Sequence, residues 1–132
     1  MFSPRSPTYL QIELTVVKCL VVDNEPAIRS VIAAVLAPLT PEIVECADGA
    51  GVLDAFETHQ PDVVLMDIAM GTLDGLSATR ALRAEHRSAC VIIVTNFDGV
   101  DLRQAAAAAG ASAYVLKDNL LELLPLIARL LR

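Results

Sequence analysis

Residues 61–76 read PDVVLMDIAMGTLDGL, which predicts a strand, a loop and the start of a helix. Four apolar residues, 63–66, stand together, and the charged Asp67 follows them at once. An unbroken apolar run of strand length is typical of a strand that is buried on both faces of a parallel sheet. Gly71, Asp74 and Gly75 then indicate a loop. The stretch therefore predicts a buried strand with an aspartate at its carboxyl end.

The same order of short apolar run, turn and amphipathic stretch occurs five times along the chain. Strands that alternate with helices indicate a parallel sheet, because each crossover helix lies on one face of the sheet. We therefore predict an α/β fold with a doubly wound sheet of five parallel strands, in the order 2-1-3-4-5, and helices on both faces. The predicted strands are 16–22, 42–46, 62–66, 90–95 and 113–116, and the predicted helices are 25–36, 50–59, 76–86, 98–110 and 119–132.

The last predicted helix, 119–132, is more apolar than a helix that is buried along one face. A wide core face is one explanation, and a surface for a partner or a second copy is the other. Pro125 should kink this helix, unless the helix begins later than predicted. Two apolar stripes run along it, one of Leu120, Leu124, Ile127 and Leu131 and one of Leu123, Leu126 and Leu130.

Composition excludes several classes of protein. The chain has 132 residues, 55% of them hydrophobic and 20% charged, which indicates one folded domain rather than a disordered chain. A net charge of −6 argues against nucleic-acid binding, because phosphates bind clustered lysine and arginine. No apolar run is long enough to span a membrane, and the start of the chain does not resemble a secretory signal, so we expect a cytoplasmic protein. Residues 1–15 are predicted to be a leader, flexible or partly strand.

Three cysteines, Cys19, Cys46 and Cys90, lie far apart in the sequence. Their odd number and wide spacing argue against a disulfide framework and against a zinc site of the Cys-x-x-Cys type. We interpret all three as small core residues in strands.

Polar residues follow four of the five predicted strands. Asp23, Asp67, Thr95 and Lys117 each stand at or just after the end of an apolar run. Parallel strands place their carboxyl ends at one edge of the sheet, where doubly wound folds bind their ligands. With strands one and three as neighbours, the two aspartates should converge, and the threonine and the lysine should approach from the other side. Taken singly, Asp23 could merely cap a helix and Lys117 could be a solvated strand end.

Two close carboxylates repel each other, so both ionise fully only beside a cation. Mg²⁺, with oxygen ligands and several waters, suits such a pair. An aspartate can also attack phosphorus to give an aspartyl phosphate, whose charge Mg²⁺ and a lysine would offset. The edge therefore indicates phosphoryl chemistry.

Five fragments make residues 16–132 resemble the receiver domain of bacterial response regulators, which has a flavodoxin-like fold. The most specific are residues 61–76 and GASAYVLKD at 110–118, and LVVDNEP, ECADG and VIIVTN at 20–26, 45–49 and 91–96 support them. The resemblance implies that Asp67 accepts a phosphoryl group, and that Asp23, Asp67 and the backbone carbonyl of Ala69 hold Mg²⁺. It also implies that Thr95 is the switch hydroxyl, that Lys117 pairs with the phosphoryl group, and that Tyr114 is the aromatic switch residue.

Four positions differ from the usual family pattern. Asn24 stands where a second acid is usual, so we expect its contribution to Mg²⁺ binding to be weakened or indirect. Asn96 replaces a small residue at the entrance to the phosphoryl site, where it either crowds the site or changes the attack of water. Gly71 replaces a common proline, so the loop after Asp67 should be looser, and Asp118 also replaces a usual proline.

The leading hypothesis is a Mg²⁺-dependent receiver that takes its phosphoryl group from a sensor histidine kinase or a phosphotransfer protein and then switches its binding to a downstream protein. Such a domain is a phosphoacceptor and not an enzyme, apart from self-phosphorylation by small donors and self-dephosphorylation. A homodimer could form through the face of helix 98–110, strand 113–116 and the last helix. We expect a stand-alone receiver, with a piece of a longer chain as the alternative.

Two other hypotheses stay open at this point. A pseudo-receiver would act as a constitutive interaction or dimerisation module without phosphorylation, as Asn24 and Asn96 suggest. A flavin-binding relative is disfavoured, because the acidic loop DNEP at 23–26 lacks the glycine, serine and threonine residues that hold a phosphate.

Overall fold

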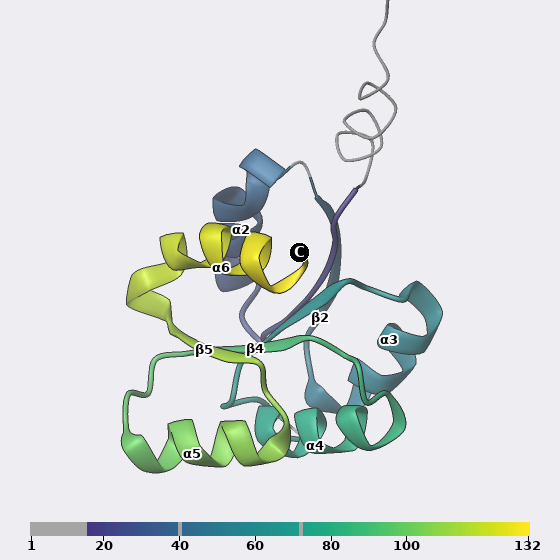
Figure 1. Ribbon diagram of the computed structural model, residues 1–132, viewed down its shortest axis with the longest axis vertical. Helices are drawn as coiled ribbons and strands as arrows, with labels where there is room; N and C mark the ends of the chain where they lie inside the picture. Colours follow the sequence, from purple (N-terminus) through teal and green to yellow (C-terminus); the bar gives the residue numbers. More distant parts are fainter. Residues whose placement is uncertain (1–15, 40, 72) are drawn as a thin grey trace, which may run out of the picture.

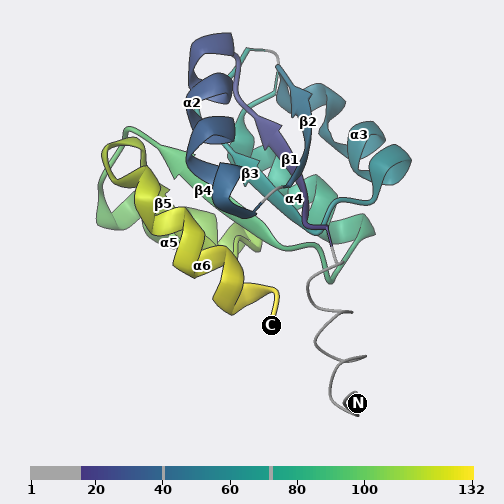
Figure 2. The same ribbon diagram turned by 90° about the horizontal axis from the view of Figure 1, so that it is seen from above.

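The computed structural model describes residues 16–39, 41–71 and 73–132. Its five strands are all parallel and form one sheet in the order β2-β1-β3-β4-β5, which confirms the predicted fold class (Figures 1 and 2). The predicted leader, 1–15, lies outside the described residues. The strands are β1 (Lys18–Val22), β2 (Glu42–Cys46), β3 (Val63–Met66), β4 (Val91–Thr95) and β5 (Ala113–Leu116).

Helices cover both faces of the sheet (Figures 1 and 2). On one face lie α2 (Pro26–Leu36) and α6 (Leu123–Leu130), and on the other lie α3 (Val52–His59), α4 (Gly75–Glu85) and α5 (Val100–Ala109). Three short 3-10 helices complete the described part of the chain: η1 (Ala37–Leu39), η2 (Gly49–Gly51) and η3 (Lys117–Glu122).

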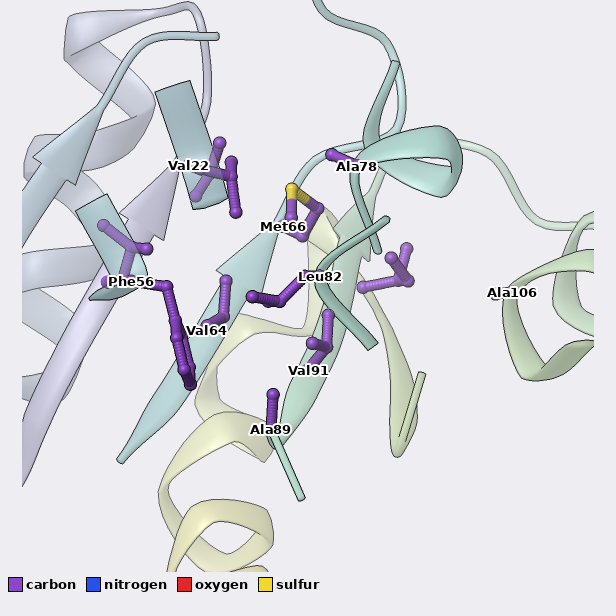
Figure 3. Packing of buried hydrophobic residues seen from close by; sticks show 12 residues of the cluster. Val22, Phe56, Val64, Met66, Ala78, Leu82, Ala89, Val91 and Ala106 are labelled. Atoms are coloured by element: carbon purple, nitrogen blue, oxygen red, sulfur yellow. The ribbon is translucent and has the colours of Figure 1, made fainter. Parts of the chain in front are cut away.

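The central strands are buried along their whole length, as the apolar runs in the sequence predict. Every residue of β3 and of β4 is buried. Alternate side chains enter opposite cores, so Val64 and Met66 pack under α3, α4 and α5, whereas Val63 and Leu65 pack under α2 and α6. Figure 3 shows the first of these cores, where Phe56 and Leu82 from the helices meet Val64 and Met66.

The end of the chain departs from the single predicted helix 119–132. A 3-10 segment, η3, comes first, with a break in helical geometry at Asn119 (φ −124°, ψ 38°), and α6 begins only at Leu123. Pro125 therefore lies in the first turn of α6, where its missing N–H has no helical partner to lose. The expected kink is replaced by a later start of the helix.

A wide core face accounts for most of the apolar character of this last segment. Leu123 and Ile127 are fully buried in the core under α2 and α6. Four further leucines from both predicted stripes are partly buried against the same core, namely Leu120, Leu124, Leu126 and Leu130. Two leucines of this segment are exposed. Leu131 belongs to the first predicted stripe, and Leu121 belongs to neither stripe.

The cysteines are free in the structure, as their spacing predicts. Cys19 is buried in β1, and Cys46 ends β2 in a partly buried position. Cys90 lies one residue before β4 rather than inside it, because the strand begins at Val91. Over the described ranges, no helix combines the length and the apolar character that crossing a bilayer requires.

Candidate functional site

Two aspartates lie side by side at the carboxyl edge of the sheet. Val22 and Met66 are paired in the register of β1 and β3, so the residues that follow them, Asp23 and Asp67, emerge at the same level. The backbone N–H of Asp67 donates to the carbonyl of Val22 at 3.0 Å, which extends the strand ladder by one residue. Both aspartates are buried, with exposed fractions of 2% and 5%.

Lys117 reaches the two aspartates from the end of β5. Its Nζ lies 2.8 Å from Oδ2 of Asp23 and 3.5 Å from Oδ1 of Asp67, and its side chain is 8% exposed. The backbone N–H of Ile68 also donates to Oδ1 of Asp67 at 2.9 Å. We call Asp23, Asp67 and Lys117 the acid–lysine cluster. The structure brings together in it three of the residues that the strand-end pattern selects.

The charges of the cluster do not balance. Burial raises the pKa of Asp67, the ammonium of Lys117 opposes this, and the carboxylate of Asp23 raises it further. Burial alone would lower the pKa of Lys117, but its hydrogen bond to Asp23 and the charge of Asp67 together raise it. With all three groups ionised, the cluster carries one net negative charge. Such an environment favours either a proton on Asp67 or a further cation.

The donor set fits a hard cation that keeps much of its water. Within 16–39, 41–71 and 73–132, no three side chains of His, Cys, Asp or Glu converge as metal ligands. A cation at the cluster would therefore depend on carboxylate oxygens, backbone carbonyls and water. This is the chemistry of Mg²⁺, whereas zinc sites usually use several nitrogen or sulfur ligands.

Thr95 connects the buried end of β4 to the protein surface. Its side chain is fully buried, and its Oγ1 accepts a hydrogen bond from the backbone N–H of Phe97 at 3.3 Å. The carbonyl of Phe97 in turn accepts a hydrogen bond from the hydroxyl of Tyr114 at 2.7 Å. Two hydrogen bonds to one residue therefore join the predicted switch residues, Thr95 and Tyr114.

A charged pair, Arg103 and Asp98, packs beside the ring of Tyr114. The guanidinium of Arg103 lies 4.6 Å from the centre of the Tyr114 ring, and Arg103 Nε pairs with Asp98 Oδ1 at 3.1 Å. Burial raises the pKa of Tyr114, and the charge of Arg103 partly opposes that rise. We call Phe97, Asp98, Arg103 and Tyr114 the tyrosine surface.

Three other predicted site residues lie at the rim of the cluster rather than inside it. Asn24, Ala69 and Asn96 directly follow or nearly follow the ends of β1, β3 and β4, and all three are exposed. All three residues are therefore in contact with solvent, at positions that directly or nearly follow the strand ends.

The role of Gly75 was not predicted from the sequence. A Cβ atom on this residue would lie 1.8 Å from the backbone oxygen of Asp67, so only glycine permits the approach. Its N–H also donates to the carbonyl of Ile68 at 2.9 Å, which closes the loop after Asp67. In the sequence, a glycine directly after Asp74 predicts a turn. It does not reveal that the residue will pack against the backbone of Asp67.

Arg29 is a second residue that the sequence analysis missed. Its Nη1 donates to the backbone carbonyl of Asp23, and its Nε pairs with Glu45 Oε1 at 2.7 Å. It therefore fixes the main chain after β1 from the first turns of α2. The contact joins residues from α2 and β2, and a local sequence pattern does not reveal it.

Comparison with known proteins identifies the family of the chain. The family described as response regulator receiver domain matches residues 19–128. The chain is 36% identical over 112 residues to the transcriptional regulatory protein PdtaR of Mycobacterium tuberculosis (strain CDC 1551 / Oshkosh), covering 83% of this chain and 54% of that protein. It is 35% identical over 114 residues to the response regulator MprA of Mycobacterium sp. (strain KMS), covering 86% of this chain and 49% of that protein.

The solved structures show the same fold. The chemotaxis protein CheY4 of Vibrio cholerae superposes with a TM-score of 0.81 at 24% identity, covering 88% of this chain and 99% of that one. The chain belongs to the response regulator receiver family of two-component systems. It spans about half the length of the curated relatives that it matches. Receiver domains are signalling phosphoacceptors that generally bind Mg²⁺ and act with histidine kinases and downstream targets.

Proposed function

We propose that this domain accepts a phosphoryl group on Asp67 from a sensor histidine kinase or a phosphotransfer protein, in a Mg²⁺-dependent step that switches its protein partners. The observation that carries the proposal is the acid–lysine cluster, in which two buried carboxylates share one ammonium. A negatively charged, lysine-bearing site at the carboxyl edge suits a phosphoryl group that arrives with a cation.

The transfer exchanges one bond to phosphorus for another. An oxygen of Asp67 forms a bond to phosphorus, while the phosphorus–nitrogen bond of the donor phosphohistidine breaks and its electron pair stays on the imidazole. Lys117, 3.5 Å from Oδ1 of Asp67, offsets negative charge on the phosphoryl oxygens. The hydroxyl of Thr95 is the proposed donor to one of these oxygens.

Four residues are proposed to hold Mg²⁺: Asp23, Asp67, Ala69 through its backbone carbonyl, and Asn24 in a weakened or indirect way. Bound Mg²⁺ would neutralise charge on the transferring group. Asn24 supplies an amide oxygen without a charge, so we expect this site to bind Mg²⁺ less tightly than a site with a third carboxylate. Asn96, exposed at the end of β4, is proposed to control access to the phosphoryl group.

The proposed switch uses the hydrogen bonds between Thr95 and Tyr114. If Thr95 turns to bind the phosphoryl group, Phe97 loses a partner and the carbonyl that holds Tyr114 is free to move. The face of α5, β5 and α6 would then change its affinity for a downstream protein or for a second copy of the chain.

The direct test is phosphorylation by acetyl phosphate with Mg²⁺, followed by phosphate-affinity electrophoresis. We expect a retarded band for the unaltered chain and none for Asp67→Asn. Asp54→Asn is the matched control, because it removes one exposed carboxylate in the first turn of α3 and should leave the band in place. A band that persists in Asp67→Asn would contradict the assignment of Asp67.

A pseudo-receiver is the second candidate, and the neutral side chains of Asn24 and Asn96 favour it. In that case the ion pair of Lys117 with Asp23 would be permanent, and the domain would bind its partner without phosphorylation. Partner affinity that is the same with Asp67→Asn, together with no effect of Mg²⁺ on the amide signals near Asp23, would support this candidate over the first.

A further inference from the structure

The loop between β3 and α4 connects Asp67 to the start of α4. It carries Ala69, and its middle contains Gly71 in place of a residue with a side chain. The carbonyl of Ile68 and the N–H of Gly75 close the base of the loop at 2.9 Å. The carboxylate of Asp74 is occupied with the cap of α4, where it accepts from the N–H of Ser77 at 2.8 Å. Further contacts to the loop come from another part of the chain.

Asp48, in the connection between β2 and α3, reaches this loop. Its Oδ1 accepts from the backbone N–H of Ala50 at 2.9 Å and from that of Leu73, 25 residues further along the chain, at 3.3 Å. Its Oδ2 lies 3.0 Å from the position that a Cβ of Gly71 would occupy. One carboxylate thus binds the N–H groups of its own turn and of Leu73, and lies beside Gly71 in the loop that follows Asp67.

Gly49 completes the contact from the same turn. A Cβ on Gly49 would lie 2.3 Å from the backbone oxygen of Leu73, so the two backbones are packed directly against each other. Both the N–H and the carbonyl of Leu73 therefore meet residues 48–49. Of the glycines in the described ranges, Gly110 is the one with a positive φ, so a side chain at Gly49 would be opposed by Leu73 rather than by backbone strain.

We propose that Asp48 is a positioning residue for the phosphoryl-transfer site: by holding Leu73, it fixes the loop that carries the Ala69 carbonyl. The inference rests on the proposed function for its consequence, because that carbonyl is a proposed Mg²⁺ ligand. No third His, Cys, Asp or Glu side chain joins the two carboxylates of the acid–lysine cluster in the described residues, so the position of the Ala69 carbonyl should affect how tightly Mg²⁺ binds. Residues that orient metal ligands commonly change metal affinity by about 10-fold to 100-fold.

The first test measures the Mg²⁺ concentration that gives half-maximal phosphorylation by acetyl phosphate, using the full chain. We expect Asp48→Ala to raise this midpoint by about 10-fold. Asp48→Asn should stay within about twofold of the unaltered chain, because its amide oxygen still accepts from both N–H groups. Asp54→Ala removes an exposed carboxylate from α3 and should leave the midpoint unchanged. A midpoint in Asp48→Ala equal to that of the unaltered chain would overturn the inference.

The second test does not require phosphorylation. Amide hydrogen exchange at 68–71 and 73 should become faster in Asp48→Ala and stay slow in Asp48→Asn. Gly49→Ala should also speed exchange there, since its Cβ displaces Leu73 while Asp48 remains, and it replaces Asp48→Ala if that variant does not fold. Gly99→Ala is the matched control, because a Cβ at Gly99 meets nothing within 4 Å.

The two tests separate the two claims. If the unaltered chain is never phosphorylated, the proposed function fails, and hydrogen exchange still decides whether Asp48 holds the loop. If exchange at 68–71 and 73 is the same in Asp48→Ala and in the unaltered chain, the role of Asp48 is wrong, whatever the result for phosphorylation.

Discussion

The acid–lysine cluster and the tyrosine surface differ in how far solvent reaches their charged groups. In the cluster, Lys117 is 8% exposed and its partner Asp23 is 2% exposed. In the tyrosine surface, Arg103 is 44% exposed and its partner Asp98 is 59% exposed. A charge that loses its partner costs several kcal/mol in a dry site and little in a wet one. The cluster is therefore suited to respond strongly to one added charge, and the tyrosine surface is suited to rearrange at small cost.

The largest expected effect comes from removing the ammonium of the cluster. Lys117→Met keeps most of the side-chain volume and should lower the free energy of unfolding by about 3 kcal/mol at neutral pH, because two buried carboxylates then face each other. Urea denaturation measures the loss, which should shrink as the pH is lowered and Asp67 takes up a proton, because its pKa is raised. Lys18→Met, which breaks a more exposed pair with Glu42, should cost less than about 1 kcal/mol. If both variants lost the same free energy of unfolding, the proposed difference between the buried and the exposed ion pair would be wrong.

The next effect concerns the backbone beneath the cluster. Gly75→Ala places a Cβ against the carbonyl of Asp67, and the resulting shift should cost about 1–3 kcal/mol of stability. The matched variant Gly99→Ala has open space around its new Cβ and should change stability by less than about 0.5 kcal/mol. Urea denaturation of both variants checks the difference. A stable, unchanged Gly75→Ala would mean that the backbone at Asp67 is more adaptable than the structure indicates.

The third variant, Asp67→Asn, should raise stability, whereas the variants above lower it. Burial raises the pKa of Asp67 in the folded state above its unfolded value, so stability falls as the pH rises from the unfolded pKa through the folded pKa. Asp67→Asn keeps an oxygen for the N–H of Ile68 but carries no charge, and it should raise stability at neutral pH by on the order of 1 kcal/mol. Unfolding measured from about pH 4 to pH 8 should show a smaller fall with pH in this variant. A steeper fall would reverse the assigned sign.

The smallest effect is expected at the tyrosine surface. Arg103→Met still covers the ring of Tyr114 but removes the charge, so stability should change by less than about 1 kcal/mol. The pKa of Tyr114 should rise, because the guanidinium now holds it down. Alkaline titration by ultraviolet absorbance, with Tyr9 replaced by Phe in every sample, measures this rise. A lower pKa in Arg103→Met would show that solvent access to the ring, rather than charge, controls the titration.

Local patterns were sufficient to predict the sheet and its edge. Strands 42–46 and 113–116 have the predicted bounds, the alternation of strands and helices indicates a parallel sheet, and the observed strand order is the predicted 2-1-3-4-5. The same alternation selects Asp23, Asp67 and Lys117, since topology alone brings the carboxyl ends of parallel strands together. These residues are far apart in sequence, but the parallel strands bring them to one edge of the sheet. No sequence motif that links one residue to another is needed to predict this.

Contacts between loops could not be predicted in this way. Leu73 binds Asp48 across 25 residues, and Gly75 is required by a backbone oxygen eight residues earlier. Each contact depends on the exact path of two irregular segments, and turn residues have many possible uses. Pro125 indicated that the last helix could begin later than predicted. The first residue of α6, Leu123, is buried in the core, which the local sequence does not reveal.

The break at Asn119 has a mechanical consequence. Lys117 and the buried Leu123 belong to one continuous stretch of chain, yet the non-helical Asn119 lies between them, so no unbroken helix joins the lysine to α6. The position of the ammonium and the packing of α6 in the core are therefore set by two separate segments of backbone.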